Sequence, residues 1–111
     1  MLEAQERWPH LWQFLGSYLH QDWPEIHGTP QAAIELAIRD YPLEARQQVA
    51  TEWWDWNVRE GSSFDPRPAI REGLGVNIEF ETSMEARQFM NRVYDWVIVS
   101  IRREAGRDWK P

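Results

Sequence analysis

The spacing of apolar residues predicts helices along most of the chain. From Trp8 to Leu19 the apolar positions recur at intervals of three and four, which is the signature of one face of an α-helix. This pattern predicts a first helix from about Trp8 to Gln21. The pair Trp23–Pro24 should end it, because the residue before a proline is pushed out of the helical region. Residues 25–28 are then expected to form a turn.

Two further helices follow at short intervals. Thr29 and Pro30 supply an N-cap and a first-turn proline for a helix that reaches about Asp40. Pro42 begins a third helix, which spans Leu43 to about Glu60 and stops where Gly61–Ser62 interrupts the pattern. The connections are short, so consecutive helices should be antiparallel or sharply angled neighbours.

The last and longest helix has a recognisable start. The stretch Thr82-Ser-Met-Glu85 is a capping box, in which the N-cap and the residue three positions later each accept a backbone N–H. The helix is expected to run to about Glu104. It should bury the apolar side that includes Phe89, Val93 and Val97 and leave Val99 on its polar side.

Residues 61–81 do not follow a helical period. Asp65–Pro66 is predicted to cap a short helix that passes Ile70 and ends at Gly73. Residues 76–81 (VNIEFE) alternate apolar and polar, as strands do, but no partner strand is evident elsewhere in the sequence. A lone strand would leave backbone groups unpaired, so an extended connector packed on the helices is expected. The prediction is an all-α fold, a compact bundle of about four main helices with a short extended segment at 76–81.

Length and composition bound the class of protein. A chain of 111 residues fits one domain, 1–111, with enough buried surface for a core. There is no cysteine, which excludes disulfides, thiolate metal sites and cysteine nucleophiles together. The N-terminus carries charges, and no segment approaches the roughly 20 apolar residues of a membrane span. A soluble, cytoplasmic protein with no membrane contact is therefore expected.

Charge and aromatic content indicate a protein partner. The net charge of −6 and pI near 5.0 argue against nucleic acid as the ligand, because phosphate binding needs clustered Lys and Arg. A basic protein suits an acidic chain better, although mild acidity is also an ordinary feature of soluble domains. The chain has eight tryptophans, and such large aromatics either fill a core or anchor an interface.

Catalytic and metal-binding patterns are not found in the sequence. The three histidines lack the spacing that places two metal ligands on one helical face. No serine lies in a nucleophile-elbow pattern, and no glycine-rich loop could hold a phosphate. Glu52 and Asp55 resemble an acid–base pair, but acidic residues at helical spacing usually form a solvated face. We therefore expect no enzyme activity, no cofactor and no metal site.

Asp22 interrupts the apolar face of the first predicted helix. Its place at a helix C-terminus is unfavourable for the macrodipole, and burial of its charge is costly without a partner. Arg46 is the natural cation, in competition with Arg39 and with the backbone N–H groups of residues 23–26. Asp22 is thus interpreted as structural, and its replacement by alanine is expected to cost about 1–3 kcal/mol.

The first half of the chain resembles a known family. The run WPHLWQFLGSYLHQDWPEIHGTPQAAIELAI (residues 8–38) followed by DYPLEA is similar to the small helical branch of the CdiI immunity proteins of bacterial contact-dependent growth inhibition. That branch has an aromatic-rich first helix that ends in a motif like YFHQDW. Here leucine replaces the expected phenylalanine, and from Asn57 onward the chain departs from the pattern. The matching residues are Tyr18, Leu19, His20, Gln21, Asp22 and Trp23.

The resemblance implies an antitoxin. Such a protein binds the C-terminal toxin domain of its cognate effector and blocks it, and many of these toxins are nucleases. A nuclease presents a basic groove, which an acidic inhibitor with exposed aromatics is suited to cover. The alternatives are an acidic interaction or regulatory adaptor without a toxin partner, and a small hydrolase with His20, Asp22 and His27 in one pocket.

The expected contact surface lies along the third helix and the loop after it. Trp54 and Trp56 flank the buried side of that helix, so one or both should be partly exposed, either over the core edge or in an interface. The same region has carboxylates that could complement a basic groove and a loop that can vary without disturbing the core. Changing Glu52 and Asp55 to lysine should accordingly slow association yet leave the melting temperature nearly intact. The candidate partner-binding residues are Glu52, Trp54, Asp55, Trp56 and Asp65, with Glu79 and Glu81 added, and the last helix around Val99 is the second choice.

Overall fold

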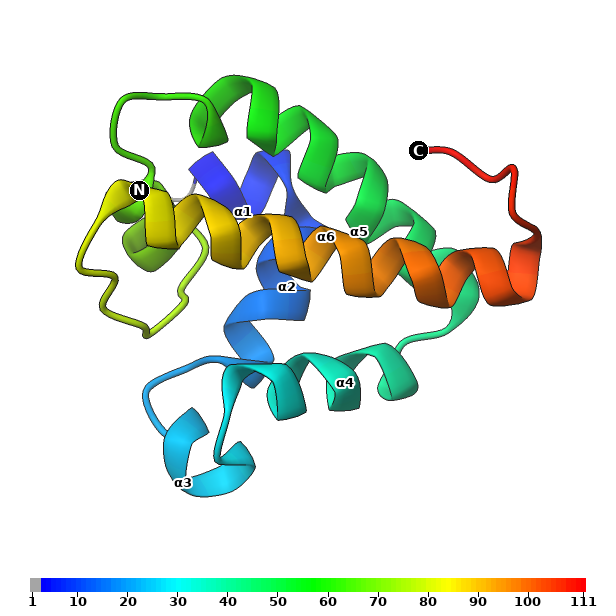
Figure 1. The fold of residues 1–111 in the computed structure, drawn as a ribbon, viewed down its shortest axis with the longest axis horizontal. Coiled ribbons are helices and arrows are strands. Elements are labelled where there is room, and N and C mark those ends of the chain that lie inside the picture. Colours follow the sequence, from blue (N-terminus) through cyan, green and yellow to red (C-terminus); the bar gives the residue numbers. More distant parts are fainter. Residues whose placement is uncertain (1–2) are drawn as a thin grey trace.

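Four helices form the body of the computed structural model, which describes residues 3–111. The longest, α6 (Ser83–Ala105), runs in the opposite direction to α5 (Leu43–Trp56) and packs against it (Figure 1). Both α2 (Pro9–Tyr18) and α6 contact α4 (Pro30–Asp40) as well as α5. The predicted all-α bundle is confirmed, and residues 3–111 form no strand.

The core lies where the apolar faces of these four helices meet. The buried side chains range in size from Ala and Val to Phe and Trp, and together they fill the space between the helices, as close packing requires. Residues from the 70–76 segment complete it. Its large, fully buried members are Trp56, Phe14, Leu11, Leu15, Leu19, Ile34, Ile70, Leu74, Met90, Ile101, Val49 and Val76.

Both predicted threonine caps are present. The Thr29 hydroxyl accepts the N–H of Ala32 at 3.1 Å, and the Thr82 hydroxyl accepts that of Glu85 at 3.1 Å. Each bond satisfies one of the donors that a helix start leaves free. The capping box differs in one detail, because the Glu85 carboxylate accepts the N–H of Glu81 at 3.2 Å rather than that of the N-cap itself.

The N-terminal region departs from the prediction. The first helix is preceded by α1 (Glu3–Arg7) and ends at Tyr18, three residues before the predicted Gln21. The predicted turn at 25–28 lies largely within α3 (Trp23–His27), whose first turn accommodates Pro24. The chain turns before α3 because His20 accepts two local bonds: its Nδ1 from the Asp22 N–H at 3.1 Å, and its carbonyl from the Trp23 N–H at 3.0 Å.

After α5 the chain continues as one turn of π-helix, and the helix then ends. The π-helix η1 (Asn57–Gly61) carries the chain on past the predicted Glu60, and the Ser62 N–H donates to the Asn57 carbonyl at 2.9 Å. Gly61 is required there, because a Cβ would lie 2.8 Å from the Trp56 ring. The predicted short helix is present as η2 (Ala69–Gly73), preceded by an Asp65 side chain that accepts the Arg67 N–H at 3.2 Å.

Residues 76–81 form the extended connector that the alternation predicts. The left-handed Gly75 (φ 69°) starts it, and Val76 is buried while Ile78 and Phe80 pack on the edge of the core. Its backbone finds partners outside a sheet: the Asn77 N–H donates to the Leu19 carbonyl at 2.8 Å. No helix among residues 3–111 has the length and apolar character to cross a membrane.

Candidate functional site

Glu52, a predicted partner contact, instead caps a helix of its own fold. Its Oε1 accepts the backbone N–H groups of His10 at 2.7 Å and Leu11 at 3.0 Å, in the first turn of α2. Its Oε2 lies 2.6 Å from the His10 Nδ1, and the side chain is only 13% exposed. A carboxylate at this place satisfies free donors and complements the helix dipole. Glu52 therefore joins α2 to α5.

This corrects the expectation that lysine at position 52 leaves stability unchanged. Glu52→Lys should lower the free energy of unfolding by about 2–3 kcal/mol, because it removes the cap and places a cation at the helix start. Urea denaturation measures the change. Glu35→Lys, a charge reversal on the exposed side of α4, is the matched control and should stay within about 0.5 kcal/mol. Equal losses in the two variants would contradict the capping role.

Asp55 and Trp54 remain accessible on the same helix. The Trp8 indole N–H donates to the Asp55 carboxylate at 2.8 Å, and with a second bond from Arg59 this holds the pKa of that carboxyl below its usual range. Trp54 is 46% exposed and donates its indole N–H to the Tyr94 hydroxyl at 2.9 Å. Both side chains are thus fixed in place and open to a partner.

Of the two flanking tryptophans, Trp54 is the exposed one, and Trp56, also named as a candidate contact, is buried. The Trp56 side chain is 1% exposed, because η1 follows directly and its Gly61 packs against the indole ring. Trp53 is buried, as the helical spacing predicts, and its indole N–H donates to the Met90 carbonyl at 3.0 Å. Trp56 therefore belongs to the core and cannot serve as an interface residue in this fold.

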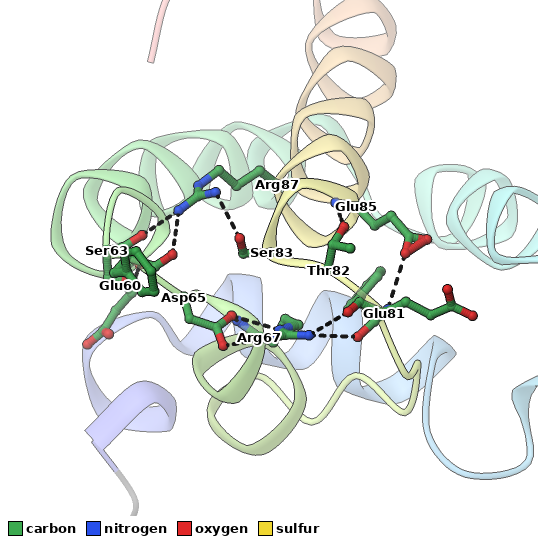
Figure 2. Close-up of polar contacts among 11 residues, drawn as sticks. Glu60, Ser63, Asp65, Arg67, Glu81, Thr82, Ser83, Glu85 and Arg87 are labelled. Carbon is green, nitrogen blue, oxygen red and sulfur yellow. Dashed lines mark hydrogen bonds and ion pairs between the residues drawn. The ribbon is translucent and has the colours of Figure 1, made fainter.

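Asp65 and Glu81 meet around an arginine (Figure 2). Arg67 donates its Nε and Nη2 to the two oxygens of Asp65 at 2.8 and 2.9 Å, which keeps the pKa of Asp65 below its usual range. Its Nη1 donates to the Glu81 backbone carbonyl at 2.8 Å. Nearby, Glu79 is 80% exposed and pairs with Arg71 at 3.0 Å. Arg67 thus joins Asp65 to the backbone at Glu81, just before α6, while Glu79 on the extended segment pairs with Arg71.

The same end of the molecule carries an aromatic residue that the sequence reasoning missed. Arg87 of α6 donates its Nη2 to the backbone carbonyls of Ser63 at 2.6 Å and Phe64 at 2.9 Å (Figure 2 shows the guanidinium over this loop). Phe64 is 97% exposed. The sequence could not identify Phe64 as a contact residue, because a single aromatic residue in a polar turn forms no periodic pattern. Its place in a turn was the only indication that it is exposed.

Three residues of the recognised motif make contacts within the fold. The Tyr18 hydroxyl donates to Asp40 at 2.8 Å, and burial together with this bond raises the pKa of Tyr18 to about 12. The Trp23 indole N–H donates to the Asn77 carbonyl at 2.8 Å. With the His20 bonds described above, these contacts join the α2–α3 turn to α4 and to the extended segment.

The predicted pairing of Asp22 with Arg46 is wrong. Because α2 ends four residues earlier, Asp22 is exposed at the start of α3, and its carboxylate accepts no hydrogen bond from residues 3–111. Arg46 is 5% exposed and pairs with Glu104, while its Nε donates to the Tyr41 carbonyl at 3.0 Å and its Nη1 to the Ser100 hydroxyl at 3.1 Å. The arginine therefore joins α5 to the end of α6.

Replacing Asp22 by alanine should consequently change the free energy of unfolding by no more than about 0.5 kcal/mol, since no bond is lost. Thr29→Ala is the comparison, because that substitution removes a real cap and should cost about 1 kcal/mol. Thermal melts of the two variants distinguish them. A larger loss for Asp22→Ala than for Thr29→Ala would restore the structural role that its sequence position suggested.

One groove on the surface has no histidine in its lining. This groove of about 750 Å³ separates the start of α4 from the extended segment and α6, and Ile78, Phe80 and Trp96 are among the residues that line it. The hydrolase hypothesis required His20, Asp22 and His27 in one pocket, yet Asp22 is exposed. Among residues 3–111, no three His, Asp or Glu side chains converge as a set of metal ligands.

Fold and surface together define a small helical protein that displays fixed aromatic and acidic side chains suited to contact with another protein. The model of the CdiI immunity protein family matches residues 7–97, and the chain belongs to this family. Comparison with curated proteins and with solved structures finds no significant match in either. Membership of the family implies that the protein neutralises a toxin of contact-dependent growth inhibition.

Proposed function

We propose that this immunity protein binds the C-terminal toxin domain of its cognate effector in the cytoplasm, and that the toxin is a nuclease whose basic groove it covers. The family match over residues 7–97 is the observation that carries the proposal. The net charge of −6 supports the nuclease, because an enzyme that binds phosphates must gather Lys and Arg, and an acidic inhibitor complements such a surface.

The contact surface is proposed from the predicted residues that the fold leaves accessible. Between η1 and α6 these are Asp65, Glu79 and Glu81, and on α5 they are Trp54 and Asp55. Glu79 and Glu81 alternate along the extended segment, so their side chains emerge from the same side of it. Charges on such a rim act mainly on the rate of encounter.

Titration of the purified toxin domain with the purified immunity protein tests the proposal. Nuclease activity should fall to zero at one equivalent, and association should slow as salt is raised. Glu79→Gln with Glu81→Gln should slow association at low salt and leave the melting temperature unchanged. The control is Glu25→Gln with Glu44→Gln, two exposed carboxylates outside the proposed surface, in α3 and in the first turn of α5, and it should not slow association. A toxin domain that stays active in excess immunity protein would contradict the proposal.

A further inference from the structure

Exposed apolar side chains concentrate around Arg87. Phe64, whose carbonyl Arg87 binds, is 97% exposed, and Met84 in the first turn of α6 is 65% exposed. Met84 precedes Arg87 by three positions, so both emerge on neighbouring parts of one helix surface. Single exposed apolar residues need no explanation, but large ones on adjoining segments are typical of interaction surfaces.

The backbone beneath Phe64 is held in place by side chains. Arg87 donates to the carbonyls of Ser63 and Phe64, and the Ser63 hydroxyl donates to the Glu60 carbonyl at 2.7 Å. On the other side of Phe64, Asp65 is bound through two oxygens to Arg67. An aromatic side chain displayed on a fixed backbone loses little conformational entropy on binding, which favours a high-affinity contact.

The charges around this residue specify the partner's surface. The guanidiniums of Arg67 and Arg87 are engaged by backbone carbonyls and Asp65 (Figure 2). Among residues 3–111, Glu60 forms no ion pair and lies beside Ser63 in Figure 2, whereas Glu81 and Glu85 lie on the other side of that view. A complementary surface therefore has an apolar pocket for the ring and basic side chains at its border.

We infer that Phe64 is the central aromatic contact with the toxin domain, inserted into an apolar pocket bordered by Lys and Arg, and that Arg87 is the positioning residue that holds it there. The inference rests on the proposed function, since it names the part of the surface through which the toxin is bound. It places the strongest contact on the loop between η1 and η2, which lies within the residues 7–97 that the family model matches.

Measurement of the dissociation constant for the toxin domain tests this. Phe64→Ala should raise the dissociation constant about 30-fold or more, the effect typical of an aromatic hot spot, with no change in melting temperature. Ile26→Ala is the matched control, because Ile26 is 61% exposed in α3, at the opposite edge of the view in Figure 1 from the loop. It should change the constant less than threefold. A change below tenfold for Phe64→Ala overturns the inference.

The positioning role of Arg87 is tested by the dissociation constants of Arg87 variants, measured with Phe64 present and with Phe64 replaced by alanine. Arg87→Gln should weaken binding about tenfold when Phe64 is present and should have no further effect in the Phe64→Ala background, since it acts through that ring. Arg87→Lys, which donates to one carbonyl only, should fall between. Effects that multiply in the double variant would overturn the positioning role. Wild-type protein that does not bind the toxin domain contradicts the proposed function, whereas wild-type binding with unaffected Phe64→Ala contradicts only this inference.

Discussion

Trp56→Ala is expected to lower the free energy of unfolding by about 3–5 kcal/mol, the largest loss for any substitution considered. The side chain is 1% exposed and belongs to the apolar core where α2, α4, α5 and α6 meet. Truncation removes the buried ring and leaves a cavity that the surrounding helices can fill only in part. The π-helical turn cannot simply collapse onto it, because η1 is shaped around the ring, with Gly61 against its edge.

Urea denaturation followed by circular dichroism measures this loss. Trp56→Phe, which keeps most of the buried apolar surface, should cost roughly half as much or less. Trp54→Ala is the exposed comparison on the same helix and should cost about 1 kcal/mol, since Trp54 is already 46% exposed. Equal losses at positions 54 and 56 would show that Trp56 is not the buried residue described above.

Arg46→Ala is expected to cost about 2–4 kcal/mol. The substitution leaves the Tyr41 carbonyl and the Ser100 hydroxyl without the donors that now bind them, in a site where Arg46 itself is 5% exposed. The partner carboxylate, Glu104, is half exposed and can be hydrated, so the larger part of the loss comes from the neutral acceptors. Burial also makes the loss insensitive to salt.

The control for Arg46 is Arg39→Ala. Arg39 is exposed in the last turn of α4, where a cation only complements the helix dipole, so its loss should cost about 0.5 kcal/mol and should shrink as salt is raised. Denaturation at low and high salt compares the two variants. An Arg46→Ala loss that disappears at high salt would mean that the arginine acts as a surface charge rather than as a buried donor.

Local patterns were sufficient to predict the helical body. Apolar periodicity located α4, α5 and α6, and the threonines at 29 and 82 marked two of their starts, because caps depend only on residues within one turn. The same periodicity failed at Asp22. It continues past Tyr18 by coincidence, and it contains no information on the His20 ring that turns the chain there.

The site was less predictable because its residues are engaged over long distances in the sequence. Glu52 looks like any solvated acidic residue of a helix, and only the fold brings it to His10 and Leu11. Trp56 is buried by a π-helical turn that no simple period predicts. Phe64 is presented by Arg87, 23 positions away, so neither its exposure nor its fixed backbone could be inferred locally.

Growth of cells that produce the cognate toxin domain tests the central claim most directly. Co-expression of the immunity protein should restore growth to the rate of cells without toxin, and it should give no protection against the toxin domain of an unrelated effector, because such pairs discriminate by surface complementarity. Growth arrest that persists when the immunity protein is present in folded form and in excess over that toxin would contradict the account.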